Sequence, residues 1–125
     1  MNKFLTIIIP SYKSNNRVLS HLKKLSKKIQ IIIVENSQDK TLKEKVEKKY
    51  KKTQVILKKN LGYGRAINFG AKLVKTKYFF VMNPDTTIYK DTLTKLVDSA
   101  KKIKSFGMLS PEHIFNKRKG KNKNE

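Results

Sequence analysis

Two stretches of the chain carry residue types that could bind an anion and a cation close together. The first is Asn60-Leu61-Gly62-Tyr63-Gly64, a glycine-rich turn that precedes an amphipathic helical pattern. Glycines let backbone N–H groups approach an anion closely, and the start of a helix supplies partial positive charge. The second is Asn83-Pro84-Asp85, directly after an apolar run, where a carboxylate can coordinate Mg²⁺ or Mn²⁺. Because an anion site beside a cation site suits a diphosphate, these stretches predict a nucleotide-binding site.

The same residues also fit simpler interpretations, which stay open at this point. Residue types such as those of Asn83-Pro84-Asp85-Thr86 favour turns on their own account, so Asp85 could be no more than a turn residue. Asn60 and Gly62 could be ordinary loop residues, or they could hold a nucleotide. Asn68 falls inside the predicted helix, where Asn is disfavoured, so we expect it to brace the loop or contact a ligand.

Polar residues also follow the first two predicted strands. Pro10-Ser11-Tyr12 comes at the end of the first strand, and Glu35-Asn36-Ser37 at the end of the second. The Glu35 carboxylate could accept hydrogen bonds from a base N–H or a ribose hydroxyl, or it could be an exposed acid near many lysines. Ser37 and Asp39 precede a helical pattern, and we expect at least one of them to cap that helix.

Strand patterns and helix patterns alternate along the chain. Short apolar runs predict strands at residues 4–9, 31–34, 55–57, 78–82 and 106–109. Apolar residues at helical spacing predict helices near residues 18–29, 42–50, 66–74 and 93–103, the last with Asp91 or Thr92 as its cap. This alternation is typical of an α/β fold with a mainly parallel sheet and helices on both faces. Since ligands of such sheets bind at the carboxyl ends of the strands, the polar residues above should gather at one edge and form a nucleotide pocket.

The composition indicates one domain, or one half of a larger one. The chain has 125 residues, no cysteine, and no apolar run near the ~18 residues needed to span a bilayer. Its first residues lead directly into a strand pattern without the features of a secretory signal, so we expect a cytoplasmic protein. Residues 116–125 have no hydrophobic pattern and are predicted to form a disordered basic tail.

The net charge of +21 comes almost entirely from lysine, since arginine occurs only at Arg17, Arg65 and Arg118. Arginine is the residue that best recognises bases and phosphates by paired hydrogen bonds. We therefore favour the interpretation that the charge comes from lysines scattered over the solvated faces of separate helices or beside them. On this interpretation we expect no specific nucleic-acid partner. The charge should still give weak association with acidic phospholipids at the inner face of the membrane. A basic nucleic-acid-binding module remains the alternative from another functional class.

Two common nucleotide-binding motifs are missing from the glycine-rich stretch. Gly62-Tyr63-Gly64-Arg65-Ala66-Ile67 lacks the third glycine of the dinucleotide fingerprint, and it follows the third predicted strand instead of the first. The Gly-Lys-Ser/Thr sequence of a P-loop does not occur either. The sequence therefore argues against a nicotinamide-dependent dehydrogenase and a P-loop enzyme.

Four stretches together resemble the family 2 glycosyltransferases with the GT-A fold. They are Thr6–Tyr12, Ile33–Ser37, Asn60–Gly70 and Asn83–Thr86, in the order and at the spacing of the family. The resemblance covers about residues 4–111 and is closest to the rhamnosyltransferase-like branch, in which the metal motif often reads Asn-Pro-Asp. It implies a shortened GT-A fold, which is a Rossmann-like three-layer α/β/α arrangement, over residues 1–115.

The resemblance also implies a function for the predicted site. It implies a nucleotide-diphosphate sugar as donor, Mg²⁺ or Mn²⁺, and inverting transfer of the sugar to an acceptor hydroxyl in cell-surface polysaccharide synthesis. Carried onto this sequence, it assigns nucleotide-sugar binding to Pro10, Ser11, Tyr12, Glu35, Ser37, Asn60, Gly62, Asn68, Asn83 and Asp85. Asp85 would bind the metal, and Asn83 would stand where other members carry an acid.

The length of the chain limits what the resemblance implies. Family members generally run to more than twice this length, and their second half carries the acceptor-binding loops and the catalytic carboxylate. We therefore expect a donor-binding portion without its catalytic base, to be completed by a second chain or by a homodimer. A nucleotidyltransferase, which shares the layered architecture, is the nearest alternative enzyme.

Overall fold

The computed structural model describes residues 3–89 and 91–112, and the chain divides into two compact units, Met1–Tyr89 and Lys90–Glu125. The first unit holds a parallel sheet and the helices α1 to α3, and the second unit holds helix α4 (Thr92–Lys102). The predicted domain boundary at residue 115 and the predicted tail over 116–125 lie outside the described residues.

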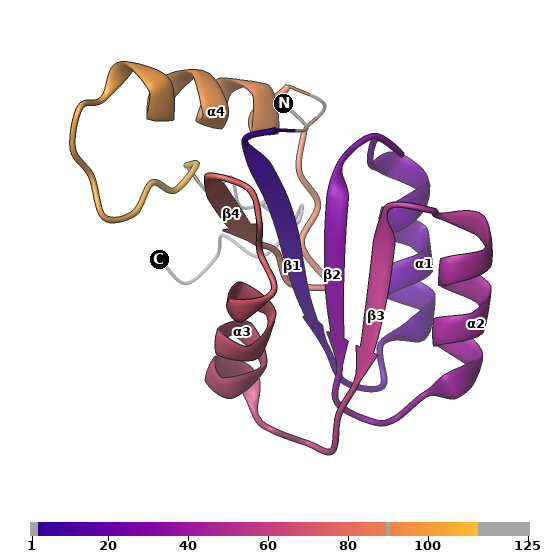
Figure 1. Ribbon diagram of the computed structural model, residues 1–125. Helices are drawn as coiled ribbons and strands as arrows, with labels where there is room; N and C mark the ends of the chain where they lie inside the picture. The colour runs from indigo at the N-terminus through magenta and orange to yellow at the C-terminus, as the bar shows by residue number, and fades with distance from the viewer. Residues whose placement is uncertain (1–2, 90, 113–125) are drawn as a thin grey trace, which may run out of the picture. The chain divides into compact units, whose positions relative to one another are not determined.

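The sheet of the first unit has four parallel strands in the order β3-β2-β1-β4 (Figure 1). The strands are β1 (Leu5–Ser11), β2 (Gln30–Glu35), β3 (Thr53–Leu57) and β4 (Tyr78–Val81). The isoleucine-rich runs of β1 and β2 are buried along their length, as expected for central strands that are covered on both faces. The predicted parallel sheet is confirmed.

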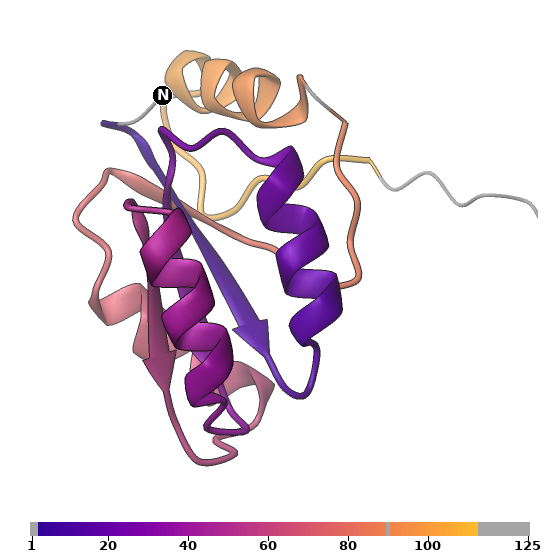
Figure 2. The same cartoon turned by 90° about the vertical axis from the view of Figure 1, so that its right-hand side faces the viewer.

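Helices cover both faces of this sheet. Helices α1 (Asn15–Lys24) and α2 (Lys40–Lys49) lie side by side on one face, and α3 (Tyr63–Lys72) lies on the other (Figures 1 and 2). The predicted three-layer α/β/α arrangement is therefore confirmed. The first helix ends at Lys24, earlier than predicted, because Leu25 adopts an extended conformation.

Helix α3 packs closely on the two central strands because its inner face carries small residues. A Cβ atom added to Gly70 would lie 2.9 Å from Ile8 Cγ2 and 3.3 Å from Val34 Cγ2. Ala66, one turn earlier, is buried in a cluster with Ile32 and Val34. The absence of a side chain at Gly70 thus sets how near the helix comes to the sheet, and it fixes the position of the glycine-rich turn that precedes α3.

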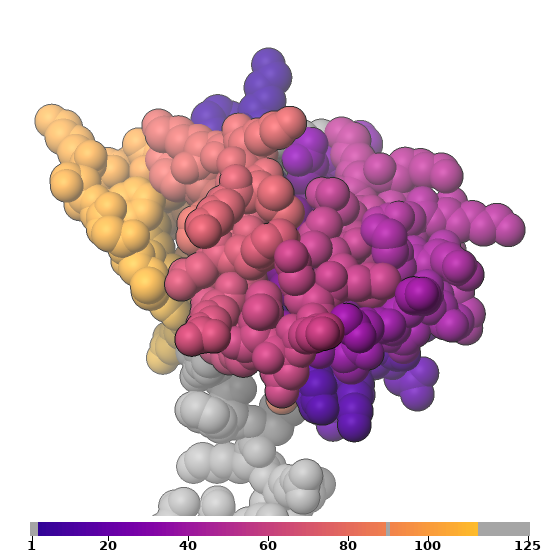
Figure 3. All heavy atoms as spheres, turned by 60° about the horizontal axis from the view of Figure 1, so that its bottom comes forward, coloured from indigo at the N-terminus to yellow at the C-terminus, as the bar shows by residue number. Residues whose placement is uncertain are grey.

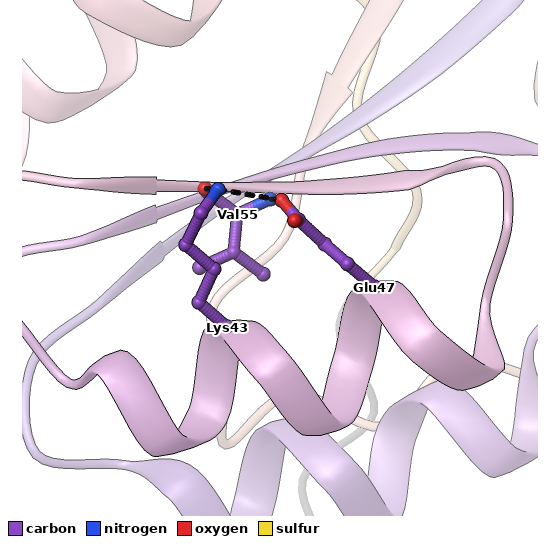
Figure 4. Close-up of polar contacts among 3 residues, drawn as sticks. All are labelled: Lys43, Glu47 and Val55. Atoms are coloured by element: carbon purple, nitrogen blue, oxygen red, sulfur yellow. Dashed lines mark hydrogen bonds and ion pairs between the residues drawn. The ribbon is translucent and has the colours of Figure 1, made fainter.

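The outer edge of β3 is closed by two side chains of α2 (Figure 4). Lys43 Nζ donates to Val55 O at 2.7 Å, Val55 N donates to Glu47 Oε1 at 3.0 Å, and Lys43 and Glu47 form an ion pair at 2.7 Å. An edge strand with free N–H and C=O groups invites pairing with another chain. The pair occupies both backbone groups of Val55 and so covers the middle of this edge.

In the second unit, α4 buries Leu93, Val97 and Ala100. Asp91, one of the two predicted caps, occupies its N-cap position but makes no side-chain cap hydrogen bond. The predicted fifth strand at residues 106–109 is wrong, since these residues form no strand. The segment contains Gly107, and the side chain of Met108 is 87% exposed. A short run with a flexible glycine becomes a strand only when it pairs with a neighbouring strand. No helix in the described part of the chain is long and apolar enough to cross a membrane.

Candidate functional site

The carboxyl ends of the strands bring the predicted polar residues of the first unit to one edge. Ser11, Glu35 and Leu57 lie in register on adjacent strands β1, β2 and β3. Strand β4 lies on the other side of β1, so the strand order reverses between β1 and β4. Ligands of open parallel sheets bind outside the strand ends at such a reversal. Figure 3, in which this edge comes forward, shows the loops after β1, β2 and β3 adjoining one another.

Asn36, which is not among the predicted site residues, connects three of these loops. Its side-chain Nδ2 donates to Ser11 O and Val34 O, both at 3.3 Å, and its backbone N donates to Ser11 O at 2.8 Å. Its Oδ1 accepts from Leu61 N at 3.2 Å, in the glycine-rich segment. The residue is 5% exposed, so these bonds are shielded from water. Its place directly after a buried strand is the signal in the sequence that could have identified it.

Glu35 is fully buried, and its carboxylate holds the loop that follows β2. Its oxygens accept from Ser37 Oγ at 2.5 Å, Ser37 N at 3.1 Å and Asp39 N at 2.7 Å. The interpretation of Glu35 as an exposed acid is therefore wrong. Because a carboxylate offers about four acceptor positions, these bonds use most of its capacity.

Asp39 caps helix α2, as predicted for one of the two polar residues before it. Its Oδ1 accepts from Leu42 N at 3.0 Å, and its Oδ2 accepts from Asn15 Nδ2. The Leu42 N–H, together with the Asn15 amide, holds the pKa of Asp39 below its ordinary value. The cap thus also joins the loop after β2 to the start of α1.

The segment after β1 supplies a buried hydroxyl and an exposed ring. Pro10 is buried within β1, and Ser11 ends the strand with its Oγ buried and without a hydrogen-bond partner in the described part of the chain. The Tyr12 ring is 48% exposed. Since buried hydroxyls are normally satisfied, the free Oγ of Ser11 is suited to a polar atom of a ligand or a water molecule.

The glycine-rich segment leads into α3 through an unusual backbone conformation. Asn60 Oδ1 accepts from Gly62 N at 3.1 Å, which forms a tight turn. Gly62 has φ 77° and ψ 169°, a region that residues other than glycine rarely adopt. Gly62 is the N-cap of α3, and it has no side chain that could accept a hydrogen bond from the first N–H groups of the helix.

Tyr63, a second residue outside the predicted set, connects this segment to the Asn-Pro-Asp turn. Its hydroxyl donates to Asn83 Oδ1 at 2.7 Å. Thr86 N donates to Asn83 O at 3.1 Å, which closes the turn that carries Asp85. Asp85 is exposed within this turn. The signal in the sequence was an aromatic residue between two glycines.

The structure does not bring every predicted residue into this network. Asn68 lies inside α3 with an exposed side chain, and no hydrogen bond joins it to other described residues of the predicted site. The described residues also contain no group of three or more His, Cys, Asp or Glu side chains that could hold a metal ion. A cation here would take its protein carboxylate from Asp85 and would need further ligands from a substrate or water.

A solved structure and a family model are similar to this chain, and both agree with its fold. No curated protein sequence matches the chain. Among solved structures, the chain is similar to S. aureus TarS residues 1–349, with a TM-score of 0.64 and 19% sequence identity. The similarity covers 91% of this chain and 40% of that chain, in agreement with a shortened GT-A fold. The sequence also matches the family model Glycosyl transferase family 2 over residues 6–124. Because this match extends over most of the sequence, the chain belongs to glycosyl transferase family 2.

Proposed function

We propose that this chain binds a nucleotide-diphosphate sugar together with Mg²⁺ or Mn²⁺ at the carboxyl edge of its sheet. It would serve as the donor-binding part of an inverting glycosyltransferase of cell-surface polysaccharide synthesis. The observation that carries the proposal is the hydrogen-bonded network of Asn36 and Tyr63, which joins the four strand-end loops in a member of a glycosyltransferase family.

The nucleoside would lie against the ends of β1 and β2. The unpartnered Ser11 hydroxyl can hydrogen-bond a base or ribose, and the exposed Tyr12 ring can stack on a base. Pro10 shapes the floor beside them. Glu35 acts mainly through its loop, because its carboxylate is already engaged by Ser37 and Asp39.

The diphosphate and the sugar would lie between α3 and the Asn83–Thr86 turn. Asn60 and Gly62 shape a loop whose backbone N–H groups, with the start of α3, favour an anion. Asn68 is assigned to the sugar side. Asp85 would hold the cation from the turn, with Asn83 beside it.

With Asp85 as its carboxylate ligand, the site fits a cation whose coordination is completed by the substrate. Magnesium commonly binds through one or two carboxylates together with substrate phosphates and water. A bound cation would neutralise the charge that builds on the departing diphosphate. The N-terminus of α3 would add partial positive charge on the same group.

In inverting transfer, the acceptor oxygen forms a bond to the anomeric carbon while the bond from that carbon to the diphosphate breaks. The hydroxyl proton passes to a base, and such assistance is typically worth about 10²–10⁴-fold in rate. We assign this base to a part of the enzyme outside the donor-binding site, since Glu35 and Asp39 are engaged and Asp85 is assigned to the cation.

Calorimetry with UDP-, GDP- and dTDP-sugars, with and without Mn²⁺, tests the proposal. We expect one donor class to bind, and we expect Asp85→Ala to remove the part of the affinity that depends on Mn²⁺. Glu44→Ala is the matched control, because it removes one exposed acid from α2. Absence of binding to all three classes, or an Asp85→Ala variant that keeps full Mn²⁺-dependent affinity, would contradict it.

A further inference from the structure

Two lysine-rich segments that are separate in the sequence meet at the amino edge of the sheet. Lysines 23, 24, 27 and 28 follow from the end of α1 into β2, and lysines 48, 49, 51 and 52 follow from the end of α2 into β3. All eight are exposed, and we call them the lysine patch. Figure 2 shows that α1 and α2 run side by side, so that both helices end at the same edge.

Direct contacts show that the two halves of the patch adjoin. Strands β2 and β3 are paired in parallel with Ile31 opposite Thr53, and Ile31 N donates to Lys52 O at 3.1 Å. The ring of Tyr50 is covered from both segments, by Lys27 Nζ at 5.9 Å and Lys49 Nζ at 5.6 Å from its centroid. The eight lysines lie on or beside two separate helices, as expected, and the ends of those two helices bring them together.

Stabilisation of the helices accounts for only part of this arrangement. Basic residues in the last turn of a helix interact favourably with its dipole, which explains the lysines at the ends of α1 and α2. Lys27, Lys28, Lys51 and Lys52 lie beyond the helices and gain nothing from that effect. No Asp or Glu occurs in residues 15–34 or 48–52. The acids of α2 before the second segment are Glu44 and Glu47, and Glu47 is paired with Lys43.

We propose that the lysine patch binds the surface of a membrane rich in acidic phospholipids. Clusters of four to eight basic residues are of the size that binds such surfaces. Because the strands are parallel, the patch lies at the edge of the sheet opposite the candidate site. Binding through the patch therefore leaves the opposite edge of the sheet, where the candidate site lies, free of the membrane.

The composition of the patch favours a lipid surface over a nucleic acid. Its cations are all lysines, which act as point charges, whereas arginine is the residue suited to paired hydrogen bonds with phosphates and bases. Its aromatic residue, Tyr50, is 6% exposed and covered by lysine side chains, so its ring is not available to stack on a base.

Sedimentation with phosphatidylcholine vesicles, with or without phosphatidylserine, tests the inference. The patch variant is Lys24→Gln/Lys28→Gln/Lys52→Gln, and the control is Lys72→Gln/Lys75→Gln/Lys77→Gln, which removes the same charge from exposed positions after and at the end of α3. We expect the patch variant to bind phosphatidylserine vesicles about 10- to 100-fold more weakly than the unchanged protein, and the control to bind within about threefold. Binding should be largely lost at about 0.5 M salt.

Three results would overturn the inference. The first is no preference of the unchanged protein for phosphatidylserine vesicles. The second is an equal loss in the two triple variants, which would mean that overall charge alone is responsible. The third is a single-stranded RNA that displaces the protein from vesicles at physiological salt, with the patch variant losing RNA affinity, because the patch would then serve nucleic acid. Melting curves of both variants verify that the fold is retained.

Discussion

The hydroxyl of Tyr63 links the glycine-rich segment to the turn that carries Asp85. In the proposed function this bond fixes the separation between the diphosphate and the cation. Tyr63→Phe keeps the ring and removes the donor, so we expect Mn²⁺-dependent binding of a nucleoside diphosphate to weaken by about 2- to 10-fold. Binding without Mn²⁺ should stay the same, and calorimetry measures both.

Tyr89→Phe is the control for this variant, because Tyr89 is 66% exposed and has no part in the site. Amide NMR shifts of Asn83, Asp85 and Thr86 give a second readout that needs no ligand. If Tyr63→Phe leaves both these shifts and the Mn²⁺-dependent affinity unchanged, Tyr63 does not position the turn.

Asp39 supplies a pH-dependent part of the stability. The Leu42 N–H and then the Asn15 amide hold its pKa below the ordinary value, so its stabilising effect is present above the unfolded-state pKa and is lost as the pH falls through the lower folded-state pKa. Asp39→Ala should lower the free energy of unfolding by about 0.5–2 kcal/mol at pH 7. Urea titrations at a series of pH values should show this difference disappearing in acid. A deficit that persists unchanged below the folded-state pKa would contradict this role.

For single residues, the residue types predicted which loops form the candidate site, but they did not predict what each side chain contacts. The polar residues after the strands could be identified because their types favour strand ends, turns and caps. The partners of Glu35 and the bonds of Asn36 depend on how three loops meet, and no local pattern encodes that. The burial of Glu35 likewise depends on the neighbouring loops and could not be predicted from the sequence around it.

Among the elements, α2 and β3 depend on each other through Lys43 and Glu47. Burial would raise the pKa of Glu47, but the bonds from Lys43 and the Val55 N–H outweigh it and hold this pKa below its ordinary value. The Glu47 contribution is therefore present above the unfolded-state pKa and lost in acid. Lys43→Ala/Glu47→Ala frees both backbone groups of Val55, so we expect self-association that increases with protein concentration.

Light scattering during size-exclusion chromatography measures this association. Glu44→Ala/Lys45→Ala is the matched control, since it removes the same two charges from exposed positions on the same helix. Equal association of the two double variants would mean that the Lys43–Glu47 pair does not protect the edge of β3.

The four strands of the sheet and the order of helices between them could be predicted because β-branched runs and helical spacing are local properties. The reversal of strand order at β1 and β4 could not be assigned to particular strands from those patterns. The failed strand at residues 106–109 has the same cause, because a strand forms only where a neighbour pairs with it.

For the molecule as a whole, the distribution of acids bears on whether the chain can complete a reaction. The first unit contains the acids Glu35, Asp39, Glu44, Glu47 and Asp85. Glu35 and Asp39 hold loops, Glu47 closes the sheet edge, and Glu44 is exposed on α2. With Asp85 assigned to the cation, Glu44 is the one of these five acids without an assigned role, and the proposed function places the base outside the donor-binding site.

Azide distinguishes a chain that lacks a base from one that cannot use its donor at all. Azide is already an anion, so it can attack the anomeric carbon and displace the nucleoside diphosphate without losing a proton, whereas an alcohol relies on a base worth about 10²–10⁴-fold. We expect donor breakdown, measured as nucleoside diphosphate released in the presence of Mn²⁺, to rise with azide and to respond little to neutral alcohols. Asp85→Ala should abolish the azide-dependent part, since the leaving group would lose its cation. Rapid transfer to an alcohol without azide would instead place a working base within these 125 residues.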